Sequence, residues 1–370
     1  MSNVTLEHIS VRKLSLDLPK SVEGSVQFPG IDSSSPAAGV SRGRYAPVPQ
    51  NSVKEIAVGS KELAARLIHQ NPSCYYEESD WISSHPEPTQ DFEQFYHDRY
   101  RSTPTSQKSA IYVQPIGSFG DSKVSPENYL KWLKDYCEAF YYGLMVKILD
   151  PVPVSQTACA FRVNEYTHNL QIHAGDLLQF LKKRKPRDAF CIVGITMIDL
   201  YPKESWNFVF GQASLTEGMG IFSFARYDSD FYSASYKGRL KSGKKYPVAD
   251  YSVFSGYYTP AITSLLLLRS CKTLTHEIGH IFGLRHCQWL QCVMQGSNHL
   301  EESDRRPLDL CPICLRKLQS AIRFNIAERY KALLRWMDDV GSGTEAEFGH
   351  AAESCSTVES MVMNIQWAEP

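Results

Sequence analysis

Hydrophobic residues in the middle of the chain follow two kinds of pattern. Short β-branched and aromatic runs bounded by glycine or proline predict strands, and apolar residues every three or four positions predict helices. The expected strands lie at 109–117, 145–154, 188–201, 208–214 and 218–228, and the expected helices at 126–145, 167–185, 260–283 and 312–338. Strands that alternate with helices predict an α+β fold, a mixed sheet with helices packed on it.

Composition divides the chain into four parts. Residues 1–52 include the Ser-, Pro- and Gly-rich stretch GIDSSSPAAGVSRGRYAPVPQNS, so we expect a flexible N-terminal region. Residues 53–108 mix short helical signals with aromatic residues and are interpreted as an extension that packs on the main domain. Residues 109–338 form that domain, and the small, acidic residues of 339–370 predict a disordered C-terminal tail.

Charge and composition narrow the function classes. The 370 residues are 43% hydrophobic and 21% charged, with a formal net charge of -1. That balance is typical of a globular protein and gives no electrostatic footprint for nucleic acid. The chain has no apolar run long enough to cross a membrane, and its N-terminus lacks the apolar block of a signal peptide. We therefore expect a cytoplasmic or nuclear location, no nucleic-acid or membrane partner, and an oligomeric state that the sequence leaves open.

The segment HEIGHIFGLRH carries the chemistry. His276 and His280 are four residues apart, so on a helix they lie one above the other and can reach one metal ion. Glu277 is about 100° around the helix from His276, too far to be an equal ligand. Its expected role is that of a general base, which takes a proton from the attacking water and passes it to the leaving amine.

A third ligand follows three residues after a glycine. Glycine adopts positive φ without steric cost, so Gly283 can end the helix and let the chain turn sharply. His286 can then return to the metal. Three protein ligands and an open position are the arrangement of a catalytic zinc site. The geometry of the helix and of the turn thus accounts for each fixed residue of the pattern H-E-x-x-H-x-x-G-x-x-H.

Four cysteines follow the third histidine: Cys287, Cys292, Cys311 and Cys314. Two close cysteine pairs are typical of a structural zinc site, in which four thiolates leave no position for water. The sequence therefore predicts two Zn²⁺ ions, one catalytic and one structural. The alternative is that the four cysteines are merely buried or disulfide-bonded. Because Cys287 is adjacent to His286, loss of the second zinc should loosen the first.

At HEIGHIFGLRHCQWLQCVM and CPIC the sequence resembles the archaemetzincins, a family of the metzincin clan of zinc peptidases. The resemblance runs from about 109 to 338 and is weaker before that. It implies a metzincin-type zincin catalytic domain with an added four-cysteine zinc site. It also implies that the three histidines and the four cysteines are zinc ligands, that Glu277 is the base, and that Met294 is a methionine in a turn beneath the histidines.

The resemblance carries further expectations. Members of the family are described as zinc metallopeptidases with aminopeptidase-like activity, so a peptide or protein substrate is implied. An edge strand at 220–226 (GIFSFAR) would hold that substrate by strand addition. Some metzincins place a tyrosine two residues after the turn methionine, whereas here Met294 is followed by Gln295 and Gly296.

Two other functions remain open at this stage. The chain could be a two-zinc protein that binds peptides or proteins with little or no cleavage. A weaker alternative is a small-molecule hydrolase that uses the same metal. Metal content and peptide cleavage, compared between the wild type and Glu277→Ala, distinguish these functions.

Overall fold

A computed structural model describes residues 5–6, 79–120, 124–241, 247, 250–288 and 290–348, and for 5–6 and 341–348 only the course of the backbone. These residues belong to one of the two units into which the chain divides; the other, Lys13–Ser73, lies outside the described residues. The flexible region expected at 1–52 therefore lies outside them except for residues 5–6, as do residues 53–78 of the extension and 349–370 of the tail.

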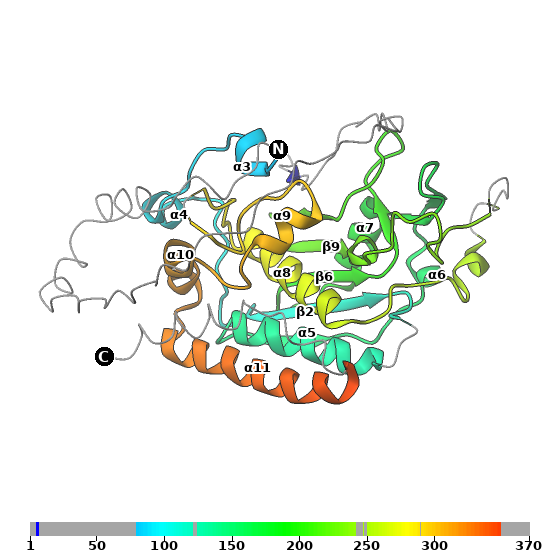
Figure 1. Cartoon of the computed structure of the whole chain (residues 1–370). Coiled ribbons are helices and arrows are strands. Elements are labelled where there is room, and N and C mark those ends of the chain that lie inside the picture. The colour runs from blue at the N-terminus through cyan, green and yellow to red at the C-terminus, as the bar shows by residue number, and fades with distance from the viewer. Residues whose placement is uncertain are drawn as a thin grey trace, which may run out of the picture. The chain divides into compact units, whose positions relative to one another are not determined.

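A six-stranded mixed sheet crosses the centre of the described part (Figure 1), in the order β1-β8-β9-β6-β2-β3. Strands β3, β2, β6 and β9 are parallel, whereas β8 is antiparallel to β9 and β1 is antiparallel to β8. The strands are β1 (Thr5–Leu6), β2 (Ala110–Ile116), β3 (Met145–Ile148), β6 (Ala189–Thr196), β8 (Gly211–Ser214) and β9 (Met219–Ser223). The mixed sheet with packed helices confirms the predicted fold class.

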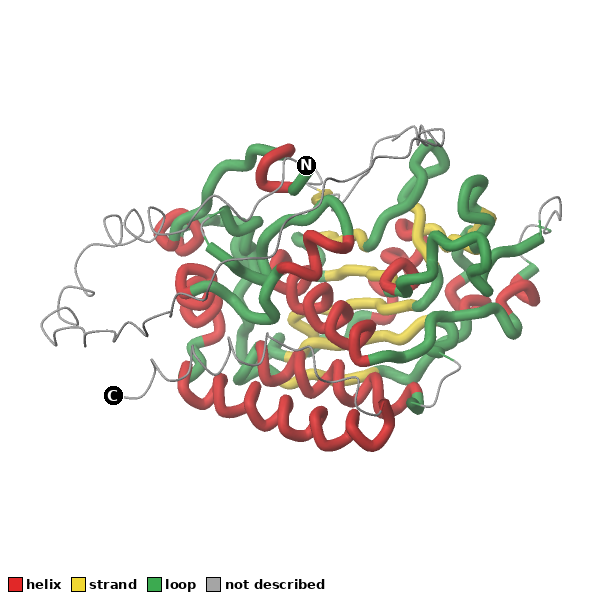
Figure 2. The backbone as a smooth tube through the Cα atoms, in the orientation of Figure 1, coloured by secondary structure: helices red, strands yellow, loops and turns green. Residues whose placement is uncertain are grey.

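Helices cover both faces of this sheet (Figure 2). Alternate residues of β2 face opposite ways: Ile111 and Val113 pack in one core cluster with α5 and α8, and Tyr112 and Ile116 pack in another with α7. Helix α11 lies outside α5. The helices of the main domain are α5 (Pro126–Phe140), α6 (Val154–Thr157), α7 (Ala174–Arg184), α8 (Ser264–Ile281), α9 (Leu300–Arg305), α10 (Pro312–Ile322) and α11 (Ile326–Phe348), with 3₁₀ helices η2 (Ala225–Tyr227) and η3 (Tyr251–Phe254).

A second sheet changes two sequence-based predictions. It has the order β4-β5-β7, formed by β4 (Phe161–Val163), β5 (Leu170–His173) and β7 (Asp199–Tyr201). The helix expected over 167–185 therefore begins only at Ala174, because Leu170 and Ile172 are buried in a strand that is paired on both sides. The strand expected over 188–201 is split between the two sheets.

The prediction of an edge strand at 220–226 was wrong. Strand β9 lies inside the sheet, between β6 and β8, so both of its edges are already hydrogen-bonded. The chain continues from β9 into η2 rather than along the sheet. A substrate cannot add to this strand, because no backbone edge of β9 is exposed to pair with it.

The helix expected over 312–338 is two helices. Arg323 has a left-handed backbone, with φ of +67°, and ends α10. Helix α11 begins at Ile326 and continues to Phe348, so the expected tail boundary at 339 falls within a helix. The short gap between the helices lets α11 turn back along α5, where Trp336 Nε1 donates a hydrogen bond to Trp132 O at 2.8 Å.

The described part of the extension packs on the main domain. It contains α3 (Trp81–Ser84) and α4 (Phe92–Tyr96), and α4 contacts α10. Asp91 caps the N-terminus of α4 with a reciprocal pair of hydrogen bonds to Gln94, so the helix begins there. Among the described residues no helix is both long and apolar enough to cross a membrane.

Candidate metal centre

Helix α8 brings the first two histidines together. Thr263 caps its N-terminus by accepting a hydrogen bond from Leu266 N at 3.1 Å, and the apolar face of the helix is buried against the sheet. His276 and His280 lie one turn apart on the same face. Their Nε2 atoms are 2.9 Å apart, so the two rings point to one place.

A glycine turn brings the third histidine back to them. Helix α8 ends at Ile281, and Gly283 has φ of +96°, as expected for a residue that reverses the chain. The ring of His286 then lies 5.4 Å from that of His276 and 5.1 Å from that of His280, measured between centroids. One nitrogen from each ring lies within 4.8 Å of the others.

Each imidazole is oriented through its other nitrogen. The acceptors for Nδ1 are Val293 O at 2.7 Å for His276, Leu284 O at 2.6 Å for His280, and Glu87 Oε1 at 2.9 Å for His286. A proton on each Nδ1 leaves Nε2 as the nitrogen that would bind a metal. Burial lowers the pKa of His280 to about 3, so this ring is neutral, the form that binds metal. This donor set fits a catalytic zinc with an open position.

Glu277 lies beside these rings in the same pocket. Its side chain is buried, and its Oε2 has no hydrogen-bond partner among the described residues. Burial raises the pKa of Glu277 to about 8, and the charge of Arg306 opposes that rise. The pocket is also lined by Tyr227, Thr273 and Ser297. A buried carboxylate with an open oxygen at this position is suited to proton transfer.

The four cysteines form a second, closed group. Their sulfur atoms all lie within 4.8 Å of one another, and the sulfurs of Cys287 and Cys311 are 3.6 Å apart. That distance is far from the S–S bond of about 2.0 Å and close to the edge of about 3.8 Å that a tetrahedron with Zn–S bonds of 2.3 Å would have. Backbone N–H groups of Met294, Cys311 and Cys314 donate to sulfur. Hydrogen bonds from Cys292, Cys311 and Cys314 hold the pKa of Cys287 well below its usual value.

One short loop connects the group of three histidines with the group of four cysteines. Cys287 N donates to Met294 O at 2.8 Å, and Val293 O orients His276. The thioether of Met294 is fully buried, and a Cβ added at Gly279 would lie 2.6 Å from its sulfur. Met294 therefore packs directly against Gly279 in the histidine-bearing turn of α8.

A third group of potential ligands is already occupied by protein contacts. It consists of Asp80, His299 and Glu302. Asp80 pairs with Arg305 at 2.5 Å, and the two oxygens of Glu302 accept hydrogen bonds from the backbone N–H groups of Trp81 and Asn298. We interpret these residues as the contact between the extension and α9.

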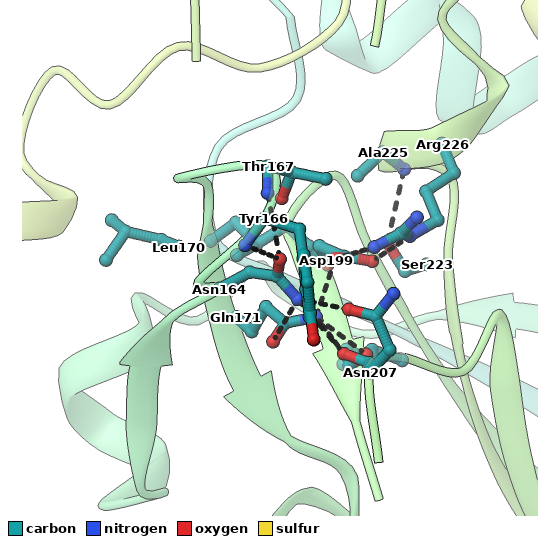
Figure 3. Close-up of polar contacts among 12 residues, drawn as sticks. Asn164, Tyr166, Thr167, Leu170, Gln171, Asp199, Asn207, Ser223, Ala225 and Arg226 are labelled. Atoms are coloured by element: carbon teal, nitrogen blue, oxygen red, sulfur yellow. Dashed lines mark hydrogen bonds and ion pairs between the residues drawn. The ribbon is translucent and has the colours of Figure 1, made fainter. Parts of the chain in front are cut away.

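A buried polar network includes Arg226, which directly precedes the pocket residue Tyr227 (Figure 3). Arg226 and Asp199 form an ion pair whose side chains are both 1% exposed, with Nη2 and Oδ2 2.7 Å apart. Gln171 donates to the same carboxylate at 2.8 Å, and Asn164 donates to Asn207. Because Tyr227 follows Arg226 directly, the network holds that tyrosine at the pocket.

Sequence reasoning missed the residues that act through tertiary contact. Glu87 lies 199 positions before His286, in the stretch SHPEPTQ, and no spacing rule connects them. Arg306 lines the pocket from the end of α9. An acidic residue in a proline-containing stretch and an arginine near a helix end are both common, so neither had a distinguishing signal.

Residues 207–320 match Peptidase family M54. Archaemetzincin-2 of Homo sapiens is 70% identical over 273 residues, which cover 74% of this chain and 76% of that protein. Archaemetzincin-1 of Homo sapiens is 37% identical over 268 residues, which cover 70% of this chain and 52% of that protein. The crystal structure of archaemetzincin from Archaeoglobus fulgidus complexed with malonate is 25% identical, with a TM-score of 0.37, and covers 56% of this chain and 99% of that one.

Proposed function

Because this chain belongs to the archaemetzincin family of zinc metallopeptidases, we propose that it hydrolyses peptide bonds at the centre formed by His276, His280 and His286, with Glu277 as general base. The observation that carries the proposal is the convergence of three buried imidazoles beside a carboxylate oxygen with no hydrogen-bond partner. The family resemblance that the motif indicated is confirmed, whereas the roles of these residues are our proposal.

Different residues of the chain have different roles at this centre. When bound, zinc would polarise the scissile carbonyl and lower the pKa of water at the open position. Glu277 accepts a proton from the attacking water and returns it to the leaving nitrogen. The pKa of about 8 in the absence of a cation falls when a positive charge is bound nearby, which favours the basic carboxylate. The carbonyl oxygens of Val293 and Leu284 hold two of the rings in the required orientation.

The four cysteines are proposed to hold a second, structural zinc. The support is the close, buried set of four sulfurs without a disulfide among the described cysteines. Because Cys287 follows His286 directly, that site would fix the chain as it leaves the catalytic centre. The proposal is therefore two Zn²⁺ ions per chain, one with an open position and one without.

A second function has one specific observation in its favour. Where some metzincins place a tyrosine after the turn methionine, this chain has Gly296, and the ring of Trp81 packs against it so closely that any side chain there would clash. Without that tyrosine, the two-zinc protein could bind a peptide and cleave it slowly or not at all.

Replacing the proposed base tests both functions. We expect Glu277→Ala to retain its zinc and to lose about 10²–10⁴-fold in peptide cleavage, the usual contribution of a general base. Metal analysis and a peptide library with free and acetylated N-termini measure the two quantities, and an aminopeptidase-like enzyme would cleave only the free peptides. Glu93→Gln is the matched control, because that side chain is 66% exposed on α4 and does not line the pocket.

The outcomes separate the proposals. Full turnover by Glu277→Ala would rule out the base. Tight peptide binding by the wild type without cleavage of any library member would favour the binding function over hydrolysis.

A further inference from the structure

We infer that Glu87 of the N-terminal extension is a positioning residue for the zinc centre, and that the segment 81–101 completes that centre by holding His286 and the turn before it. The inference rests on the proposed function, because it assumes that His286 binds the metal. It adds a residue that lies outside the expected catalytic domain of 109–338.

The carboxylate of Glu87 lies directly behind the third imidazole. Its two oxygens are 2.9 and 3.0 Å from His286 Nδ1. The same Oε1 accepts a hydrogen bond from Trp81 Nε1 at 2.8 Å, which fixes the carboxylate in place. The edge of the Trp81 ring also meets the His286 ring, with centroids 5.3 Å apart. Glu87 therefore orients His286 from the side opposite the proposed metal and does not block the open position.

The third histidine depends on this support more than the other two. His276 and His280 project from a regular helix, and backbone carbonyls of the main domain orient them. His286 stands after a turn with no regular structure, and its orienting partner is a side chain of the extension. A ligating histidine whose second nitrogen donates to a carboxylate is more basic and fixed in direction, and removing such a partner typically weakens metal binding about 10–100-fold.

A second contact of the extension holds the turn itself. Gln90 Nε2 donates to Gly283 O at 3.0 Å, and Gln90 Oε1 accepts from Arg285 N at 3.1 Å. The side chain of Gln90 thus bridges both ends of the short segment that returns His286 to the metal. Lys317 of α10 donates to the backbone oxygen of Gln90 and to Oε1, and both residues are buried.

Close packing shows that the turn and the extension fit together. A Cβ added at Gly283 would lie 3.3 Å from the Cα of Arg101, so the chain of the extension passes directly over the turn. The Trp81 ring occupies the space that the missing side chain of Gly296 leaves. Both glycines of this region are therefore needed by the contact with the extension, in addition to the positive φ of Gly283.

The test measures zinc affinity in the full chain, by competition with a chelator of known affinity. We expect Glu87→Ala to weaken zinc at the histidine centre about 10–100-fold and Glu87→Gln to weaken it less, because glutamine still accepts a hydrogen bond but carries no charge. Glu93→Gln is the matched control: Glu93 lies in the same extension, its side chain is 66% exposed, and it pairs with His97 on the surface of α4. Its affinity should equal that of the wild type.

A spectroscopic measurement distinguishes positioning from general loss of stability. In the Co²⁺-substituted protein we expect the visible absorption of the histidine site to change in Glu87→Ala and Glu87→Gln, and to stay unchanged in Glu93→Gln. The melting temperature of each metal-free variant reports folding separately. Trp81→Phe, which keeps an aromatic ring but loses the indole N–H that donates to Glu87, should show a smaller change of the same kind.

Failure of this inference and failure of the proposed centre give different results. If His280→Ala binds as many zinc ions as the wild type, the histidine centre itself is refuted. If His280→Ala loses one zinc but Glu87→Ala binds zinc within twofold of the wild type and keeps its Co²⁺ spectrum, only the role of Glu87 is refuted.

Discussion

At the scale of single residues, a buried ion pair holds the cysteine loop on the C-terminal helix. Arg329 is 0% exposed, and its Nη2 lies 2.6 Å from Asp309 Oδ1. Its Nε donates to Phe140 O at 2.8 Å. The backbone oxygen of Asp309 accepts from Val293 N at 2.9 Å, and Val293 O in turn orients His276. The pair is thus two hydrogen bonds away from His276, a proposed ligand of the catalytic metal.

We expect Asp309→Ala to lower the free energy of unfolding by about 3–5 kcal/mol, because it leaves a buried guanidinium without its carboxylate. Urea unfolding followed by circular dichroism measures the change. Glu328→Ala is the matched control, since Glu328 pairs with Lys331 on the surface of the same helix, and an exposed pair contributes at most about 1 kcal/mol. Equal effects of the two substitutions would contradict the importance of the buried pair.

At the scale of elements, the segment between α8 and α10 carries ligands of both proposed metals. His286 and Cys287 are consecutive, so any movement of the cysteine group moves the third histidine. Cys311 caps α10 by accepting from Cys314 N, which joins that helix to the same group. The two proposed sites therefore share one loop and should not be independent.

Loss of one cysteine tests this coupling. We expect Cys311→Ser to bind one zinc fewer than the wild type and to hold the remaining zinc about 10–100-fold more weakly, the size of effect seen when a support of a metal ligand is removed. Metal analysis after gel filtration and chelator competition measure both quantities. Cys159→Ser, at a buried thiol beside Thr157 and outside the cysteine group, should keep the wild-type stoichiometry. Full zinc content in Cys311→Ser would refute the structural site.

At the scale of the whole molecule, the proposed centre is assembled from parts far apart in the chain. The helix and its turn supply the histidines, the loop after them supplies two cysteines, and α10 begins with the other two. The extension supplies the partners of His286, of the turn, and of the buried Lys317. A boundary at residue 109 would separate the extension from all of these contacts.

Truncation tests that boundary. A chain that begins at residue 109 should have a lower melting temperature and weaker zinc binding, because Lys317 and the backbone of Arg285 lose their partners in a buried place. A chain that begins at residue 79 keeps every described contact except the pairing of β1 with β8, and should retain both properties. Thermal unfolding and chelator competition measure them. Equal stability of the two chains would show that residues 109–338 form an independent domain.

Among the elements, local patterns predicted the helices and strands more reliably than their arrangement. The helix over α5 was predicted from its apolar face and from Pro126 at its start. The helix over α8 was also predicted, but its start was expected at 260 and lies at Ser264. The order of strands was not predictable, because it depends on which edges pair. For this reason β9 was expected at an edge and lies inside the sheet, and β5 was assigned to a helix.

The sequence by itself determined the local geometry of the candidate metal centre. The helical period places His276 above His280, glycine permits the turn at Gly283, and adjacent cysteines share the loop, all within covalent reach along the chain. Only the tertiary structure decided which residues orient the proposed ligands. Glu87 and Gln90 reach His286 and its turn across almost 200 positions, and such contacts depend on how the extension packs against α10 and α9, which no local period records.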